Sequence, residues 1–245
     1  MSFTFFRPRK DGPEIVIEDA VVSNYPVVFA ENDLPRWAAG SVPIGAGIPD
    51  IVIVTCKPQV FALAQLDMPN AHILAYLRGV NKAKLDTISE RIGKPQEVIV
   101  RSLNGLIDID VVSNETNYYS LVPRWREILP DIVTIEVKVT NWRKAIDQAV
   151  RNRIFAHRSF IALPERLAHR VYTDEIFKQF GIGVLSVTDD NQVSIVRRAR
   201  RHQPRVWAYY YHLASFVATN SDGVLPCPIT SQLSKQRLHT QSIPL

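Results

Sequence analysis

The sequence predicts an α/β protein whose core is interrupted by a separate small unit. Short apolar runs at 51–54 and 159–163 are bounded by turn residues, which is typical of buried strands. Residues 132–139 alternate apolar and polar side chains as a strand does, and a helical stretch at 142–156 follows. Strands that alternate with helices indicate a layered α/β core.

The interrupting unit is predicted to span residues 57–123. Three helices followed by two strands are expected there, at 71–78, 82–92, 95–104, 107–112 and 118–122. Asn81 can cap the second helix, Gly93 can end it, and Pro95 suits the first turn of the third. Three short helices followed by a β-hairpin resemble the winged helix-turn-helix family, and the polar turn 113–117 resembles the tip of its wing.

The remaining segments give secondary-structure signals of unequal clarity. Residues 13–23 mix strand and helix signals, and 27–29 are expected to form a short strand. Beyond the core strands, we expect helices at 173–180 and 207–217, strands at 184–187 and 193–196, and an irregular tail at 219–245. The predicted division is therefore a first core part at 1–56, the insertion at 57–123, a second core part at 124–218, and the tail.

Composition narrows the function classes. The 245 residues carry a net charge of +5, but residues 136–245 hold sixteen basic and eight acidic side chains, while 1–135 hold thirteen and sixteen. This asymmetry fits either a phosphate-facing surface or a solvated arginine-rich one. The two cysteines form no CxxC pair, which argues against a zinc site. No apolar run approaches about 20 residues and no signal-peptide pattern is present, so a cytoplasmic location is expected.

Three side chains carry the predicted chemistry. Asp50 begins the apolar strand 51–54, while Glu136 and Lys138 stand two apart on the strand 132–139 and leave the same face. If the two strands are neighbours, all three groups converge at one edge of the sheet. Carboxylates that hold Mg²⁺ or Mn²⁺ can neutralise a phosphate and activate water, and a lysine can stabilise developing negative charge.

These residues resemble the PD-(D/E)XK nuclease superfamily. Pro49-Asp50 matches its first half-motif and Glu136-Val137-Lys138 its second. The resemblance implies a restriction-endonuclease-like mixed central sheet flanked by helices, with the winged helix inserted between the two catalytic strands. It also implies that Asp50 and Glu136 are metal ligands and that Lys138 is the catalytic lysine.

The resemblance suggests further site residues. The family often adds a glutamine in the helix after the second motif, and Gln148 lies there. One subgroup has a tyrosine four residues later, where this chain has Asn152. Many members carry an acidic residue on a helix before the first strand, for which Glu18 and Glu31 are both candidates. A Glu-x-Lys triplet alone has little weight, because such pairs also form ordinary surface ion pairs.

Candidate nucleic-acid contacts lie in two places. In the insertion they are on the third helix, away from its apolar face; after the second motif they are on the outer side of the next helix. The residues are Gln96, Arg101 and Asn104, then Arg143, Lys144 and Arg151. The insertion carries seven basic and seven acidic groups, so contact with a partner protein or a second copy is nearly as well supported as DNA reading. The run 197–201, RRARR, fits either nucleic-acid binding or a solvated strand end.

The function expected from these residues is a Mg²⁺-dependent or Mn²⁺-dependent DNA endonuclease. Two alternatives stay open. One is a non-catalytic DNA-binding regulator that uses the winged helix. The other is a protein-interaction subunit of a larger nuclease or transposition assembly.

Overall fold

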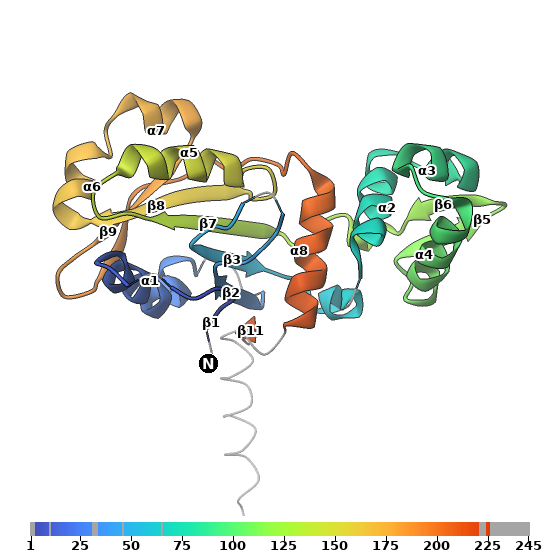
Figure 1. The fold of residues 1–245 in the computed structure, drawn as a ribbon, viewed down its shortest axis with the longest axis horizontal. Helices are drawn as coiled ribbons and strands as arrows, with labels where there is room; N and C mark the ends of the chain where they lie inside the picture. Colours follow the sequence, from blue (N-terminus) through green and yellow to red (C-terminus); the bar gives the residue numbers. More distant parts are fainter. Residues whose placement is uncertain are drawn as a thin grey trace, which may run out of the picture.

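A mixed β-sheet organises the larger part of the molecule, and a small helical unit lies beyond helix α8 (Figure 1). The computed structural model describes residues 3–9, 11–30, 34–45, 47–64, 66–220 and 224–225. The predicted α/β class and the mixed central sheet flanked by helices are confirmed. Of the helices described, none combines the length and apolar composition needed to cross a bilayer.

Eight strands of the described chain form the main sheet, in the order β1-β2-β3-β7-β8-β9-β10 with β11 also on β2. Their bounds are β1 Thr4–Phe5, β2 Arg36–Gly40, β3 Ile51–Thr55, β7 Asp131–Val137, β8 Arg158–Pro164, β9 Gly183–Val187, β10 Val193–Arg197 and β11 Val224–Leu225. The pairs β7–β8 and β8–β9 are parallel, whereas β2–β3, β3–β7 and β9–β10 are antiparallel. The strands that carry Asp50 and Glu136 are therefore direct neighbours, as the sequence argument required.

Helices cover both faces of this sheet. Helix α1 (Glu14–Val28) packs on one face, against Ile51, Ile135 and Phe160. The opposite face is covered by α5 (Trp142–Asn152), α6 (Glu165–Val171), α7 (Glu175–Phe180) and α8 (Trp207–Thr219). Because β3 is buried on both faces, it reads as a nearly continuous apolar run. Strand β7 is buried on both faces too, but it carries the polar residues Thr134 and Glu136.

The N-terminal expectations need correction. The mixed signal at 13–23 belongs to α1, and residues 27–28 close that helix instead of forming a strand. Isoleucine and valine favour strands, but burial of Ile17, Val21 and Tyr25 against the sheet stabilises the helix here. Strand β2 was not predicted, since its sequence RWAAG has only one residue with strong strand preference.

Other boundaries shift by a few residues. The predicted helix 142–156 ends at Asn152, and the predicted helix 173–180 begins at Glu175 with Asp174 as its N-cap. Helix α6 was missed because it starts directly after β8, without an intervening loop. For the predicted irregular tail 219–245, residues 221–223 and 226–245 lie outside the described residues, while Val224–Leu225 pairs with β2.

The small unit has the predicted order of three helices and a hairpin. It comprises η1 (Pro58–Leu63), α2 (Met68–Gly79), β4 (Ala83–Lys84), α3 (Leu85–Ile92), α4 (Gln96–Asp108), β5 (Val112–Glu115), β6 (Tyr118–Leu121) and η2 (Pro123–Trp125). Its strands form a second sheet in the order β4-β6-β5. Gly93 ends α3 in the left-handed conformation, as predicted.

Two details of this unit differ from the sequence prediction. Residues 107–108 belong to α4 instead of a strand, because Leu106 continues the buried face begun by Ile99 and Leu103. Asn81 does not cap α3, since residues 83–84 form β4 before the helix begins. The hairpin turn is confined to Thr116 and Asn117, both with positive φ, which is the type I′ geometry of tight hairpins.

The small unit shares a core with the rest of the molecule. One buried apolar cluster runs from Val52 and Val54 of β3 through Leu213 of α8 to Leu74 of α2 and Leu103 of α4. Figure 1 shows α2 beside α8, with α3, α4 and the hairpin farther from the main sheet. The insertion is therefore packed against α8 instead of being joined by a linker alone.

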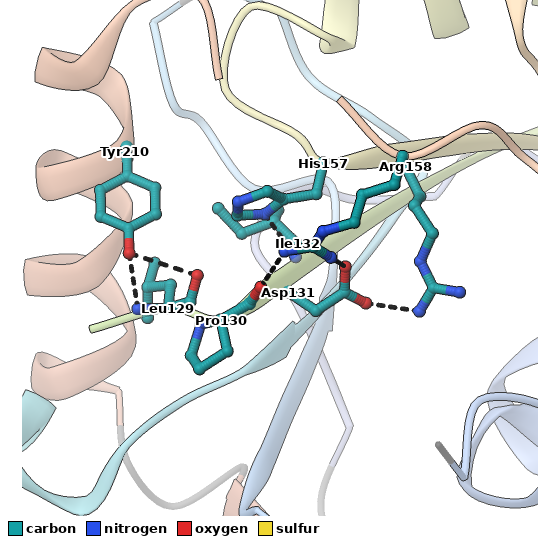
Figure 2. Close-up of polar contacts among 8 residues, drawn as sticks. Leu129, Pro130, Asp131, Ile132, His157, Arg158 and Tyr210 are labelled. Carbon is teal, nitrogen blue, oxygen red and sulfur yellow. Dashed lines mark hydrogen bonds and ion pairs between the residues drawn. The ribbon is translucent and has the colours of Figure 1, made fainter. Parts of the chain in front are cut away.

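A polar cluster fixes the beginning of β7 (Figure 2). Asp131, which is 7% exposed, accepts from Arg158 at 2.5 Å and from Arg201 at 2.6 Å. His157 accepts from the backbone N–H of Ile132 through Nδ1 at 3.1 Å, and the Tyr210 hydroxyl lies 2.7 Å from the backbone nitrogen of Leu129. His157 is buried and directly precedes β8.

Candidate functional site

A cleft of about 500 Å³ opens where β7 ends, β3 begins, and helices α1 and α5 start. Its walls come from four segments that are distant in sequence. The lining residues are Arg7, Pro8, Arg9, Glu14, Glu18, Ser41, Asp50, Lys138, Asn141, Lys144 and Gln148. Three acidic and four basic side chains thus share one concave surface.

Asp50 is held rigidly at this edge. Its Oδ2 accepts from the backbone N–H of Val137 at 2.7 Å, and its backbone carbonyl accepts from Ser41 at 3.0 Å. The loop before it turns through Gly45 and Gly47 at φ values of +86° and +153°, which disfavour other residues. The positive φ values let the chain bend before the strand, and the Val137 N–H holds the carboxylate beside the end of β7.

Lys138 lies one residue beyond β7. Its ammonium is 3.2 Å from a carboxylate oxygen of Glu14 and 3.8 Å from Oδ2 of Asp50. Lys138 contacts Glu14 of α1, whereas Glu136 bonds to Asn152 of α5. The two motif residues therefore reach toward different sides of the sheet, and the prediction that both leave the same face is wrong. The strand pleat no longer fixes the direction of Lys138, because the strand has ended at Val137. Lys138 and Glu136 nevertheless both interact electrostatically with Asp50.

Glu136 is the most deeply buried acid of the site, at 1% exposure. The register Ile51↔Ile135, extended by one residue, places it opposite Asp50. Its Oε1 accepts from the Asn152 side chain at 2.7 Å, while its Oε2 is buried without a hydrogen-bond partner in the structure described. Burial and then the charge of Asp50 raise the pKa of Glu136 to about 8.

The acids of α1 join the same site. Burial and then the charge of Asp50 raise the pKa of Glu18 to about 7. Arg9 lies 3.8 Å from Oε2 of Glu18, but that oxygen has no hydrogen-bond partner among the described residues. Burial likewise raises the pKa of Asp50. Of the two upstream candidates, Glu18 lines the cleft, while Glu31 lies outside the described residues.

Helix α5 supplies the remaining predicted group. Asn141 caps the helix by accepting from the Lys144 backbone at 3.3 Å. Lys144 and Gln148 follow at one-turn intervals and line the cleft, and Asn152 comes one turn later. Oε1 of Gln148 is buried and accepts no hydrogen bond from the part of the chain described. The structure therefore gathers Asp50, Glu136, Lys138 and Gln148 around one edge.

The donor set fits a hard divalent cation. Mg²⁺ prefers oxygen ligands and is usually held by one or two carboxylates with waters and substrate oxygens. Glu136 and Gln148 each present a buried oxygen that no N–H of the described residues satisfies, and Asp50 lies beside Glu136. No group of three or more His, Cys, Asp or Glu residues in the described ranges has the arrangement of a complete metal cage. A two-carboxylate site completed by substrate needs none.

The predicted nucleic-acid contacts divide between two regions. Lys144 lines the cleft, whereas Arg143 stacks on Trp142 and Arg151 lies exposed on α5 near enough to Glu136 to lower its pKa. Gln96, Arg101 and Asn104 are exposed on α4 in the small unit, with Gln96 hydrogen bonded to Asp86 at 2.7 Å. In the run 197–201, Arg197 and Arg201 bind backbone carbonyls and Asp131, which is a structural role.

Sequence reasoning missed three parts of the site. Glu14 contacts Lys138 and stands one helical turn before Glu18, so assignment of α1 as a helix would have found it. Asn152 was noted only as a departure from a family pattern, yet it orients Glu136. Arg7 and Arg9 line the cleft from the N-terminal segment, and no local pattern marks them.

Comparison of the chain with protein-family models, with curated proteins and with solved structures found no match.

Proposed function

We propose that the chain is a divalent-metal-dependent endonuclease that hydrolyses phosphodiester bonds in DNA. One observation carries this proposal: Asp50, Lys138 and Gln148 line one cleft, Glu136 lies opposite Asp50 on β7, and Glu136 and Gln148 each bury an oxygen that has no donor among the described residues. Leaving such acceptors unsatisfied costs free energy in a purely structural site. A cation would satisfy them.

The residues of the chain have distinct roles in this proposal. Asp50 and Glu136 would hold Mg²⁺ or Mn²⁺, which neutralises phosphate charge and lowers the pKa of water. The Val137 backbone fixes Asp50, and Asn152 fixes Glu136, so that both carboxylates are oriented in advance. Gln148 offers a carbonyl oxygen from α5.

Lys138 is placed to act on the reacting phosphate. Glu14 and Asp50 hold its ammonium at the cleft wall, where it can stabilise charge that develops during attack. Arg7, Arg9 and Lys144 line the same cleft and can attract a polyanion. The acids alone would repel DNA, so these cations are needed for the substrate to approach.

The small unit has a separate place in the proposal. Its order of three helices and a hairpin is the one expected for a winged helix, and Arg101 and Asn104 lie exposed on α4, which would be the recognition helix that contacts the major groove. Its balanced charge gives little nonspecific affinity of its own. We therefore assign catalysis to the cleft and target choice, through DNA or a partner protein, to the insertion.

A cleavage assay tests this function. Supercoiled and linear DNA are incubated with Mg²⁺ or Mn²⁺ and with wild-type protein, Asp50→Ala or Lys138→Ala. We expect each substitution to lower cleavage at least about 100-fold while DNA binding persists. Asp147→Asn, an exposed acid on α5 outside the cleft, is the matched control and should cleave as the wild type does.

Two other outcomes would replace the proposal. DNA binding without cleavage under either metal would favour a non-catalytic DNA-binding regulator. Absence of both binding and cleavage would favour a protein-interaction subunit, which a pull-down with the intact chain would then examine.

A further inference from the structure

A second concave surface adjoins the catalytic cleft and differs from it in charge. It is a groove of about 270 Å³ lined by Val139, Thr140, Pro164, Arg166, Leu167 and Arg170. No acidic side chain lines it in the part of the chain that the structure describes. The cleft itself has three acidic residues in its walls.

The groove and the cleft share one short segment as a common wall. Lys138 and Asn141 line the cleft, whereas the two residues between them, Val139 and Thr140, line the groove. Consecutive Cα atoms are about 3.8 Å apart, so these four residues span at most about 11 Å. A DNA strand whose scissile phosphate sits at Lys138 would therefore have neighbouring phosphates at the groove.

Helix α6 presents the two arginines on one side. Arg166 and Arg170 are four residues apart, which puts their side chains one turn above each other. Leu167 and Val171 anchor the helix in the apolar core, so its position is fixed while both guanidinium groups stay exposed. Arginine suits phosphate because its planar guanidinium can donate two parallel hydrogen bonds.

These arginines differ from Arg153 and Arg197, which are bound within the fold. Arg153 donates to the Phe180 carbonyl and Arg197 to the Tyr172 carbonyl. Arg166 and Arg170 make no ion pair or hydrogen bond with any residue in the described ranges, and Thr140 adds a hydroxyl to the groove wall. The groove thus offers free donors without internal compensation.

We infer that this groove binds the DNA backbone beside the scissile phosphate, with Arg166 and Arg170 as phosphate contacts. The inference rests on the proposed function for the position of the scissile phosphate. The groove would set the direction in which the strand leaves the cleft. It is a binding subsite and takes no part in the chemical step.

DNA binding as a function of salt concentration tests the inference. Anisotropy of a labelled DNA duplex, measured without added metal so that no cleavage occurs, gives the slope of log K against log salt. Each phosphate contact contributes about 0.9 to this slope. We expect Arg166→Ala and Arg170→Ala each to flatten it by about 0.9, and the double variant to bind about tenfold more weakly.

Matched variants separate a specific contact from loss of charge. Lys178→Ala removes one exposed positive charge from α7, outside both groove and cleft, and should leave the slope nearly unchanged. Arg166→Lys/Arg170→Lys keeps both charges and should recover most of the slope. The inference would be overturned if the double alanine variant had the same affinity and slope as Lys178→Ala. It would also be overturned if the two arginines affected the binding of an RNA duplex but not that of a DNA duplex.

Failure of the groove inference can be distinguished from failure of the proposed function. If the wild type binds DNA through these arginines but does not cleave it, the groove stands and the nuclease proposal fails. If the wild type cleaves DNA and the arginines do not matter for binding, the groove fails and the nuclease proposal stands. Absence of any DNA binding would contradict both.

Discussion

The two ends of strand β7 carry opposite kinds of buried polar group. At its start, Asp131 uses both carboxylate oxygens, one with Arg158 and one with Arg201. Near its end, Glu136 uses one oxygen with Asn152, and its other oxygen is buried without a donor among the residues that the structure describes. Both acids stand on the same strand and both are buried, so the difference lies in their partners. A carboxylate with both oxygens paired is accounted for by its structural role, whereas a buried carboxyl oxygen without a partner points to a ligand site.

Neutralising Glu136 and Asp131 in separate variants tests the difference between the two ends most directly. Glu136→Gln should lower DNA cleavage about 100-fold or more, because the variant loses a charged oxygen from the proposed metal site. Asp131→Asn should retain near wild-type cleavage below its melting temperature. Initial cleavage rates with Mg²⁺ measure both. Equal losses of activity in the two variants would remove the distinction between the two ends.

Stability should show the reverse order. Asp131→Ala removes the carboxylate that contacts both Arg158, whose side chain is 13% exposed, and Arg201. We expect the free energy of unfolding to fall by about 3 kcal/mol, because removing one partner of a largely buried ion pair is strongly destabilising. Glu136→Gln should cost much less, because it removes a carboxylate that burial already disfavours. Denaturant titration without metal measures both changes, and a larger loss for Glu136→Gln would contradict this assignment.

The pH dependence of stability should have opposite signs for the buried groups at the two ends of β7. In the unfolded chain Glu136 releases its proton near pH 4.5, but in the metal-free folded protein its pKa is about 8. The folded state therefore holds more protons, and the free energy of unfolding falls as pH rises through this window. Glu18, raised to about 7, acts in the same direction. Glu136→Gln should flatten this decline by on the order of 1 kcal/mol between pH 6 and pH 8.

His157, beside the start of β7, gives the opposite slope. Burial lowers its pKa from 6.5 to about 4, so the unfolded chain holds more protons in that range. Stability should fall as pH drops from 6.5 towards 4, and His157→Gln should flatten only this acidic limb. Denaturant titrations at matched ionic strength measure both limbs. A Glu136→Gln profile identical to the wild type above pH 6 would show that Glu136 is not held protonated.

The sequence predicted the two strands of the site correctly, but it did not predict the helix and the side-chain partners around them. Strand β3 is an apolar run bounded by turn residues and β7 alternates apolar and polar residues, and the motifs placed Asp50 just before the one and Glu136 on the other, which are neighbours. Helix α1 was ambiguous, because its valines and isoleucines favour strands until the sheet buries them. The partnership of Asn152 with Glu136, sixteen residues apart, depends on how α5 docks on β7, which local pattern does not encode. The same holds for Glu14 and Lys138, 124 residues apart.

Calorimetric titration of the metal-free protein with Mn²⁺, without DNA, tests the central claim most directly. The account predicts binding by the wild type and by Asp131→Asn with equal affinity, and a loss of about tenfold or more in Glu136→Gln. Wild-type protein that binds Mn²⁺ no better than Glu136→Gln would contradict it.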